Sequence, residues 1–238
     1  PFPSYSNRHL RAFIASRGCP YNCSYCFNHA YRNMYKDSGL VTRVRIRSVA
    51  NLVQEIAAVR KCYGNSSITF FDDIFPTKND WLEEFSYEYG KQIQLPFECN
   101  LRVEQITPQV VAYLKKAGCT ILAIGIETED RLLRASILRR NYSNEQITRA
   151  CALVREQGIL LKTYNILGLP PGDLNREWDT MKFNSECSVD IPTASLFQPY
   201  PGTVLGEEAK RRGDWDGNLD DIRLGFYDSS PIRIKDRA

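Results

Sequence analysis

Short apolar runs rich in β-branched residues alternate along the chain with segments whose apolar residues recur every three or four positions. The first kind of segment predicts strands and the second predicts amphipathic helices. The predicted strands are His9–Ser16, Ile68–Phe71, Phe97–Leu101, Thr120–Ile126, Ile159–Leu167 and Ile191–Phe197. The predicted helices, with their capping residues, are Ser48–Tyr63, Asn79–Ile93, Thr107–Gly118, Ser143–Gly158, Asn175–Cys187 and Val204–Arg212.

Residues at the helix ends support these boundaries. Thr107 and Pro108 suit the N-cap and the first helical position, and Gly118 suits the stop of the same helix. Ser143 and Gln146 have the spacing of a capping box, in which each side chain bonds the backbone N–H of the other residue. Local chemistry and hydrophobic period therefore agree on where these two helices begin.

Six consecutive β–α units predict an α/β fold, a parallel sheet covered by helices. The pattern alone does not separate an open doubly wound sheet from a barrel, although six units are too few for a complete eight-stranded barrel. No Gly-x-Gly-x-x-Gly turn follows the first strand, as a dinucleotide-binding fold would require. Residues 1–212 are expected to form one core domain. The polar, aperiodic stretch 213–238 is expected to be an unstructured tail or the start of a following segment.

Composition narrows the class of protein. Of the 238 residues, 43% are hydrophobic, and 31 Lys and Arg against 28 Asp and Glu give a net charge of +3. The hydrophobic fraction is too high and the net charge too low for a disordered chain. No apolar run approaches the roughly 18–20 residues of a membrane span, and so mild a balance argues against a nucleic-acid partner. The start without Met and the end without a closing element favour a piece of a longer polypeptide.

The cysteines are distributed unevenly. Three of the eight, Cys19, Cys23 and Cys26, follow the first predicted strand with the spacing Cys-x3-Cys-x2-Cys. Thiolates in a tight loop suit zinc, for which His29 could supply a fourth ligand, or an iron–sulfur cluster. Three thiolates alone would hold three irons of a cubane and leave the fourth iron open to another ligand. The five scattered cysteines are predicted to be packing residues: Cys62, Cys99, Cys119, Cys151 and Cys187.

The cysteine loop, with Tyr25 before its last cysteine and a β/α repeat around it, resembles the signature of the radical S-adenosylmethionine (radical SAM) superfamily. The resemblance covers roughly residues 9–212. It implies a partial (β/α)6 barrel and a 4Fe-4S cluster held by Cys19, Cys23 and Cys26. It also implies that the amino and carboxylate groups of S-adenosylmethionine (SAM) bind the open iron. Reductive cleavage of SAM would then give a 5′-deoxyadenosyl radical that abstracts a substrate hydrogen.

The same resemblance implies a set of SAM-contacting residues at the carboxyl ends of the strands. The pair Asp72-Asp73 stands where the family has Gly-Gly-Glu, which binds the SAM amino group. Glu127 resembles the acid that bonds the ribose, although Glu129 stands where a Gly is usual. Arg140 resembles the base that meets the methionine carboxylate, with Arg139 as the competing assignment. The resemblance also implies that Tyr25 and Ile166-x-Gly168 lie near the adenine. Phe27 and Gln198 are the remaining residues expected to bind the cofactor. No catalytic residue is assigned.

The Arg-Gly-Cys-Pro opening, the Phe-x-Asp-Asp segment and the Gly-Leu-Pro-Pro-Gly turn look most like the subgroup that carries a separate cobalamin-binding domain. Those enzymes methylate or rearrange unactivated carbon, so either a C-methylation, by a methyltransferase, or a rearrangement is expected, with cobalamin held by a domain outside this chain. Two alternatives stay open: methylthiotransferase-like sulfur insertion, and a non-catalytic zinc or iron–sulfur module closed by His29. We expect a small-molecule substrate, an electron donor such as a flavodoxin or ferredoxin, and a cytoplasmic location, because cluster thiolates need a reducing compartment.

Overall fold

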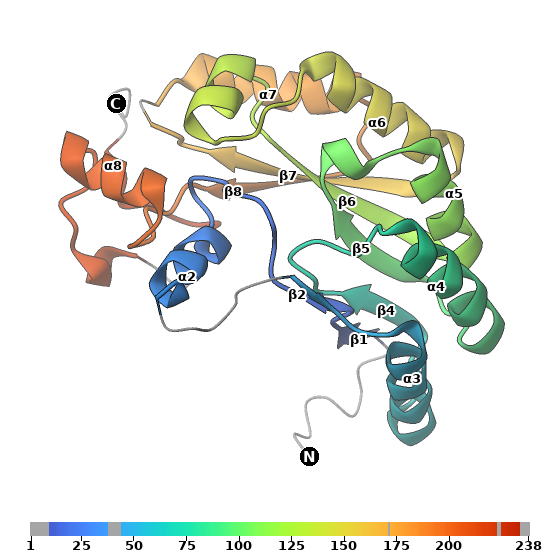
Figure 1. Cartoon of the computed structure of the whole chain (residues 1–238). Helices are drawn as coiled ribbons and strands as arrows, with labels where there is room; N and C mark the ends of the chain where they lie inside the picture. The colour runs from blue at the N-terminus through green and yellow to red at the C-terminus, as the bar shows by residue number, and fades with distance from the viewer. Residues whose placement is uncertain (1–9, 38–43, 171, 223–224, 234–238) are drawn as a thin grey trace. The chain divides into compact units, whose positions relative to one another are not determined.

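The computed structural model describes residues 10–37, 44–170, 172–222 and 225–233. Six strands form one sheet in the order β1-β4-β5-β6-β7-β8, and the pairs β1–β4, β4–β5 and β5–β6 are parallel (Figure 1). The alternating α/β fold of partial-barrel type is confirmed, with β1 and β8 at the two ends of the order. The strands of this sheet are β1 (Leu10–Phe13), β4 (Ser67–Phe70), β5 (Phe97–Leu101), β6 (Cys119–Glu127), β7 (Leu160–Leu167) and β8 (Ile191–Leu196).

Of the α-helices in the described residues, six match predicted ones to within two residues at each end, and one was not predicted. The unpredicted helix is α2 (Phe27–Tyr35), directly after the cysteine loop. Every helix within the described ranges is too short or too polar to serve as a membrane span. The matching helices are α3 (Val49–Tyr63), α4 (Asn79–Gln92), α5 (Pro108–Ala117), α6 (Asn144–Glu156), α7 (Leu174–Glu186) and α8 (Val204–Arg212).

The helix caps form as the sequence predicts. Thr107 accepts a hydrogen bond from the Val110 N–H at 3.2 Å, and Gly118 takes the left-handed conformation with φ of 103°. The Ser143 hydroxyl accepts from the Gln146 N–H at 3.2 Å, while the Gln146 side chain accepts from the Ser143 N–H at 2.8 Å. Both bonds of the capping box are therefore present, and each satisfies a donor that the helix start would leave unpaired.

The chain divides into two compact units. The first consists of Pro1–Gly18, Val44–Ile124 and Arg149–Lys162, and the second of Cys19–Arg43, Gly125–Thr148 and Thr163–Ala238. The chain crosses from one unit to the other after Gly18 and after Arg43, and again within β6, α6 and β7. The first unit therefore holds the early strands and helices, and the second holds the cysteine loop and the carboxyl ends of β6 and β7.

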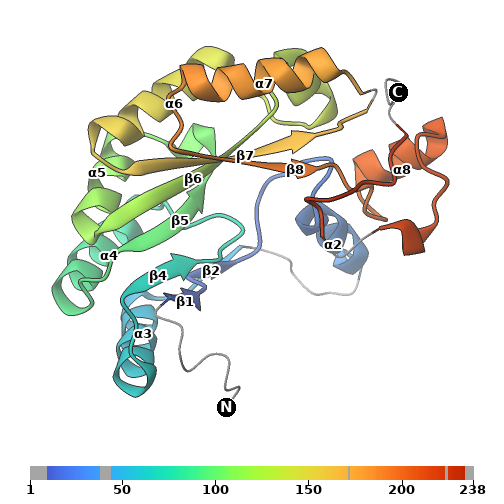
Figure 2. The ribbon, with the colours of Figure 1, turned by 180° about the vertical axis from the view of Figure 1, so that it is seen from behind.

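The first unit is built on stacked aromatic rings. Phe70 of β4 meets Phe97 of β5 edge-to-face at 5.4 Å, and Phe85 of α4 lies 5.8 Å from both rings. Edge-to-face pairs at this spacing are favourable beyond the apolar area they bury. Helices α3, α4 and α5 pack in sequence along these strands, as two opposite views show (Figure 1, Figure 2).

The first predicted strand is too long at its carboxyl end. Strand β1 ends at Phe13, and a separate strand β2 (Ser16–Arg17) pairs antiparallel with β3 (Arg45–Ile46). The start of the predicted strand, His9, lies outside the described residues. The break has a physical cause: the buried Asp72 carboxylate accepts from the N–H groups of Ala15 and Ser16, which turns the backbone out of the sheet.

The stretch after Gly213 contributes to the core of the second unit, which the sequence pattern did not predict. Trp215 and Ile232 are each 3% exposed. They pack in one cluster with residues of β7, α8 and the segments beside them: Leu133, Leu138, Ile166, Leu169, Phe197, Leu205 and Ala209. Trp215 and Ile232 are 17 positions apart and form no periodic pattern, so the sequence did not predict that they are buried.

Replacing Trp215 by alanine should lower the free energy of unfolding by about 3–5 kcal/mol, because a fully packed indole leaves a large cavity. Urea unfolding of the full chain measures this. The matched control is Trp178→Ala, since Trp178 is 61% exposed and should change stability by about 0.5 kcal/mol at most. Equal effects of the two substitutions would contradict the packing of the C-terminal stretch.

Candidate functional site

The three clustered cysteines lie on the loop that leads into α2. Cys26 is the N-cap residue of that helix, and its N–H donates to the Cys23 carbonyl at 3.2 Å. Cys23 is buried, whereas Cys19 and Cys26 are half-buried. No disulfide joins any of the eight cysteines, all of which lie in described parts of the chain. The three thiols thus share one short, turn-rich segment at a helix start.

An arginine of α2 shapes this loop. Arg32 donates to the Cys19 carbonyl at 3.1 Å and to the Tyr21 carbonyl at 2.7 Å, and it also bonds the Asn22 side chain. The Asn28 amide lies 3.8 Å from the Cys26 sulfur. The sequence analysis missed Arg32 because it missed α2, which places that guanidinium back over the loop.

The donor set fits an iron–sulfur cluster in its chemistry, since soft thiolates are the usual ligands. Within the described residues, however, no group of three or more His, Cys, Asp or Glu side chains is arranged to hold a metal ion. His29, the candidate fourth ligand for zinc, is buried in α2 with its ring 3.4 Å from the Asn33 amide. Ligation by Cys19, Cys23 and Cys26 therefore stays a prediction.

Arg140 joins the cysteine loop to the carboxyl end of β6. Its Nη1 lies 3.9 Å from the Cys23 sulfur, 2.9 Å from the Tyr25 hydroxyl and 3.0 Å from Glu127 Oε1. Tyr25 in turn donates to Glu127 Oε1 at 2.7 Å. A second nitrogen, Nη2, donates to the Gly125 carbonyl at 2.9 Å. The structure thus brings together three of the residues expected at the SAM site: Tyr25, Glu127 and Arg140.

Burial governs the charges in this network. Burial raises the pKa of Tyr25 well above its ordinary value, and the neighbouring Glu127 raises it further, so Tyr25 is a neutral phenol that donates. Burial by itself lowers the pKa of Arg140, whereas the negative charge of Glu127 raises it, and the net shift is to well above the ordinary value. A permanent cation is thus held where both side chains of the ion pair are 7% exposed.

Glu127 is held in an unusual backbone conformation. Its φ is 67°, and the Thr128 N–H donates to the Ile126 carbonyl across it at 2.9 Å. Such a tight turn costs of order 1–3 kcal/mol for a residue with a side chain, and strain of this kind clusters at functional sites. Glu129, the departure from the family pattern, points its carboxylate to the Asn144 amide at 2.6 Å.

A second buried arginine holds the segment between Glu127 and Arg140. Arg134 is fully buried in a single π-helical turn, Leu133–Ile137, and donates to the carbonyls of Thr128 at 2.7 Å and Tyr142 at 2.9 Å. Tyr142 bonds Arg140 Nε at 2.7 Å and donates to the Gly125 carbonyl at 2.8 Å. Sequence reasoning missed both Arg134 and Tyr142, because a buried arginine within an aperiodic segment has no pattern that reveals it.

Arg139 and Arg140, the two competing assignments for the SAM carboxylate contact, lie in different environments. Arg139 is exposed with φ of 58°, while Arg140 is 6% exposed and enters the network. The left-handed residue reverses the chain so that the Arg140 N–H bonds the Arg134 carbonyl at 2.9 Å. A contact of Arg140 with the SAM carboxylate stays a prediction.

A cavity of about 340 Å³ borders Tyr25 and Glu127. Gln198 lies in its wall, 4% exposed, with Nε2 donating to the Ser229 carbonyl at 2.6 Å. Its other polar atom, Oε1, is buried without a hydrogen-bond partner among the described residues. A buried acceptor without a donor suits a ligand amino group. The rest of the wall is mostly aromatic and consists of Tyr164, Ile166, Ser195, Leu196, Phe197, Tyr200 and Phe226.

Two other expected contacts are placed outside the cavity wall. The Gly168 N–H donates to Glu177 at 2.9 Å, with Gly168 φ at 73°. Phe27 begins α2 and packs against Tyr200, with the two rings tilted and their centroids 4.5 Å apart. Ile166, by contrast, serves both the wall and the apolar cluster. The sequence did not predict that Phe226 lines this cavity, because Phe226 lies in the aperiodic stretch 213–238.

Asp72 and Asp73 belong to the first unit and differ from each other. Asp72 is 3% exposed and accepts three hydrogen bonds, from the Ala15 N–H at 3.0 Å, the Ser16 N–H at 2.5 Å and the Ser16 hydroxyl at 2.6 Å. Burial raises the pKa of Asp72, which these bonds partly counteract. Asp73 is exposed. In the structure Asp72 shapes the turn after β1, and binding of the SAM amino group by either acid stays a prediction.

Four of the five scattered cysteines are buried as predicted, and one is not. Cys99, Cys119, Cys151 and Cys187 are at most 5% exposed. Cys62 is exposed near the end of α3, so its expected packing role was wrong. The helical period places residue 62 one position off the buried stripe that Leu52 and Ile56 define.

Comparison with known proteins identifies the family. The model of the radical SAM superfamily matches residues 13–183. An uncharacterised methyltransferase of Pyrococcus horikoshii is 25% identical over 198 residues, which are 82% of this chain and 41% of the relative. The hopanoid C-2 methylase of Rhodopseudomonas palustris is 24% identical over 226 residues, 90% of this chain and 41% of the relative.

A solved structure shares the fold. The radical SAM methyltransferase TsrM from Kitasatospora setae, with cobalamin and a 4Fe-4S cluster bound, superposes with a TM-score of 0.72 at 19% identity, covering 87% of this chain and 38% of TsrM. The chain belongs to the radical SAM superfamily, as the cysteine loop indicates. It spans about two fifths of the length of the curated relatives it matches. The family implies a 4Fe-4S cluster and SAM.

Gly125→Ala should destabilise the protein by about 1–3 kcal/mol, because overpacking displaces neighbours that are held in place. A Cβ atom at this position would stand 2.2 Å from Glu127 Oε1 and 3.0 Å from Arg140 Nη2. Urea unfolding measures the loss. In a Glu127→Ala background the first clash is absent, so the same substitution should have a smaller effect. Equal penalties in the two backgrounds would show that the carboxylate does not limit the site.

Asp72→Asn should lower the free energy of unfolding by about 1–3 kcal/mol, because an amide group must face a backbone donor where a carboxylate oxygen accepted one. The matched control is Asp73→Asn, whose exposed side chain should tolerate the change. Both variants are also titrated with SAM. A weaker SAM affinity in a stable Asp73→Asn variant would favour the family-like role for that acid, whereas an unchanged unfolding curve for Asp72→Asn would contradict the turn-holding role.

Proposed function

We propose that this chain is the core of a cobalamin-dependent radical SAM methyltransferase, in which Cys19, Cys23 and Cys26 hold the 4Fe-4S cluster. One observation carries the proposal. A single guanidinium, Arg140, reaches the sulfur of Cys23, the hydroxyl of Tyr25 and the carboxylate of Glu127 at the same time. The cysteine loop and the acid at the end of β6 are thereby tied together beside a cavity of about 340 Å³.

In this proposal the residues divide the work of binding SAM by charge. Arg140 presents a cation to the carboxylate of the methionine part, and Glu127 presents an acceptor to the ribose hydroxyls. The Gln198 Oε1 atom accepts from an amino group, since it is buried with no donor among the described residues. The aromatic wall, including Phe197 and Tyr200, supplies flat apolar area for a base. Buried, preorganised groups of this kind bind strongly because they need no reorganisation.

The cluster and SAM together supply a 5′-deoxyadenosyl radical or a methyl group when bound, and the protein supplies position and exclusion of water. Arg140 can donate to the Cys23 sulfur, and hydrogen bonds to cluster sulfurs tune such centres. Burial of Cys23 shields that side of the loop from solvent. The chain itself therefore contributes a buried position for Cys23 and a guanidinium that can donate to its sulfur.

The finer assignment to methyl transfer rests on the relatives. Two of them are named as a methyltransferase and a methylase, and the solved relative TsrM contains cobalamin. We place cobalamin in a domain outside this chain, because no cobalamin-binding histidine motif is present in its sequence. The substrate would be a small molecule, with the electrons coming from a donor such as a flavodoxin or ferredoxin.

The test is anaerobic reconstitution of the full chain with iron and sulfide, followed by reduction in the presence of SAM. We expect a brown protein with about four irons, the content of a cubane cluster, that converts SAM to 5′-deoxyadenosine or S-adenosylhomocysteine. Cys23→Ala should lose the cluster while keeping its circular dichroism. Cys62→Ala is the matched control, because that thiol is exposed on α3 and should leave the iron content unchanged.

A colourless protein with stoichiometric zinc would contradict the proposal and favour a zinc module. Full iron content in Cys23→Ala would contradict the ligand assignment alone. Methyl transfer is tested separately, by adding methylcobalamin to the reconstituted protein and following its demethylation in the presence of a methyl acceptor.

A further inference from the structure

Within the described residues of the first unit, strand β1 has one edge that pairs with no other strand of the main sheet. In the sheet order β1 is a terminal strand, paired on one side with β4. The Phe71 N–H donates to the Phe13 carbonyl at 2.9 Å, which places the polar groups of Phe13 on the side of β4. Alternate residues of a parallel strand bond the same neighbour. Arg11 and Phe13 therefore face β4, and the N–H and C=O groups of Ala12 and Ile14 face outward.

A contact of Ile14 supports this assignment. Its carbonyl accepts from Arg47 Nη1 at 3.2 Å, on the side away from β4. Farther along the chain, the Ala15 carbonyl accepts from the Arg47 N–H at 2.9 Å. Among the described residues, the edge is thus closed at its carboxyl end by Arg47 and open beside Ala12, whose side chain is exposed. An open strand edge is a template for pairing with another extended segment.

Arginines surround this edge. Arg17 and Arg45 stand directly opposite each other in the β2–β3 pair, where like charges repel. Neither has an ion-pair partner in the described part of the chain. Arg47 is already bonded to Glu55, the one acid among the residues that line the cavity here.

These features share one cavity of about 630 Å³, lined by β1, β2, β3 and α3. Its formal charge is +3, from four arginines (Arg11, Arg17, Arg45 and Arg47) less Glu55. The lining also includes two exposed apolar residues, Ala12 and Ile14, the latter 38% exposed. The cavity therefore offers an open main-chain edge, a small apolar strip and unbalanced positive charge in the same place.

We propose that this edge is a docking site for an extended acidic segment of a partner protein, which adds to the sheet as a strand beside β1. The main chain of the segment would pair with the outward groups of Ala12. Its carboxylates would meet Arg17 and Arg45 and relieve their repulsion. Main-chain bonds supply affinity in this mode of recognition, and alternate side chains supply specificity.

The geometry favours a peptide over a small anion. A phosphate group needs donors that converge on one point, whereas these arginines come from β1, β2, β3 and the residue position directly before α3's N-cap. A small anion also makes no use of the strand edge. Charged side chains can protect an edge from pairing, but protection does not require two like charges opposite each other without a counter-ion.

The test uses a blocked seven-residue peptide of alternating glutamate and valine, and its glutamine–valine counterpart, with binding to the full chain followed by fluorescence anisotropy. We expect saturable binding of the glutamate peptide and about tenfold weaker binding at high salt, because exposed ion pairs are screened. Arg17→Gln combined with Arg45→Gln should weaken binding about tenfold, while Arg60→Gln on α3, whose guanidinium bonds the Ile93 carbonyl away from this cavity, should not.

Strand addition has its own test in Ala12→Pro. Proline removes an outward N–H and leaves the β1–β4 bonds of Arg11 and Phe13 intact, as edge positions allow. Binding should be lost, while Ala12→Ser, which keeps the N–H, should bind as the parent does. Circular dichroism and urea unfolding confirm that each variant is folded; if Ala12→Pro does not fold, an N-methylated glutamate peptide tests the same bonds from the partner's side.

The proposal is overturned if the glutamate peptide does not bind, if the glutamine peptide binds equally well, or if Ala12→Pro and the N-methylated peptide bind normally. It is also overturned if inorganic phosphate competes at the concentration at which the peptide binds, since the site would then be a small-anion site. None of these measurements depends on the cluster or SAM, so their failure leaves the proposed function unaffected.

Discussion

A buried guanidinium must have its charge balanced and its donors satisfied from within, and Arg140 meets both needs with groups from three separate segments. Nη1 is shared by Tyr25, Glu127 and the Cys23 sulfur, Nη2 bonds the Gly125 carbonyl, and Nε bonds Tyr142. Removing one partner of such a pair leaves an uncompensated charge, which costs several kcal/mol. The cysteine loop, the end of β6 and the segment before α6 are therefore coupled through one side chain.

That coupling needs a second arginine to hold its framework. Between Glu127 and Arg140 the chain has no periodic apolar face, so packing alone does not fix its path. Arg134 fixes it with bonds to three backbone carbonyls and the Asn144 side chain, while its guanidinium lies 5.0 Å from the centre of the Tyr142 ring. Arg140 lies 5.4 Å from the same ring. Tyr142 thus transmits the position of one cation to the other.

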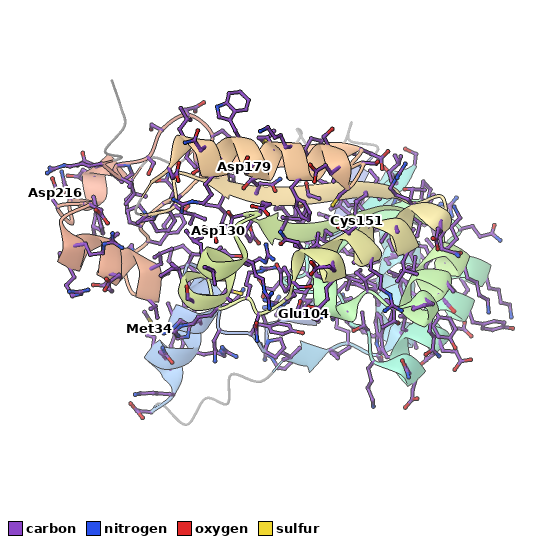
Figure 3. All side chains as sticks on the ribbon, turned by 90° about the horizontal axis from the view of Figure 1, so that it is seen from above. Met34, Glu104, Asp130, Cys151, Asp179 and Asp216 are labelled. Atoms are coloured by element: carbon purple, nitrogen blue, oxygen red, sulfur yellow. The ribbon has the colours of Figure 1, made fainter. Side chains whose placement is uncertain are left out.

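The sequence predicted what depends on local period and capping. All six main-sheet strands, six helices and the capping box at Ser143 and Gln146 follow from residues within a few positions of each other. It missed what depends on distant partners. Asp72 ends β1 from 57 residues away, and Trp215 reaches a core that no periodicity indicated. Helix α2 was missed for another reason. Tyr31 is 53% exposed and Met34, which is labelled in Figure 3, is 68% exposed, so the apolar residues of α2 do not mark a buried face.

The site shows the same division between motif and context. The residues that a motif marks, from Cys19 to Cys26, are close in sequence, and their chemistry can be inferred from spacing. Other residues allow the buried pair of Glu127 and Arg140 to form, and no motif marks them. They are Gly125, which leaves room for the carboxylate, and Tyr142, which bonds the guanidinium. Gly125 is required because any side chain there would occupy the place of the Glu127 carboxylate. With its φ at 67°, Glu127 accepts a hydrogen bond from Tyr25 and forms an ion pair with Arg140. The backbone strain at Glu127 is offset by its ion pair with Arg140. The two charged side chains are thereby held buried in one fixed geometry.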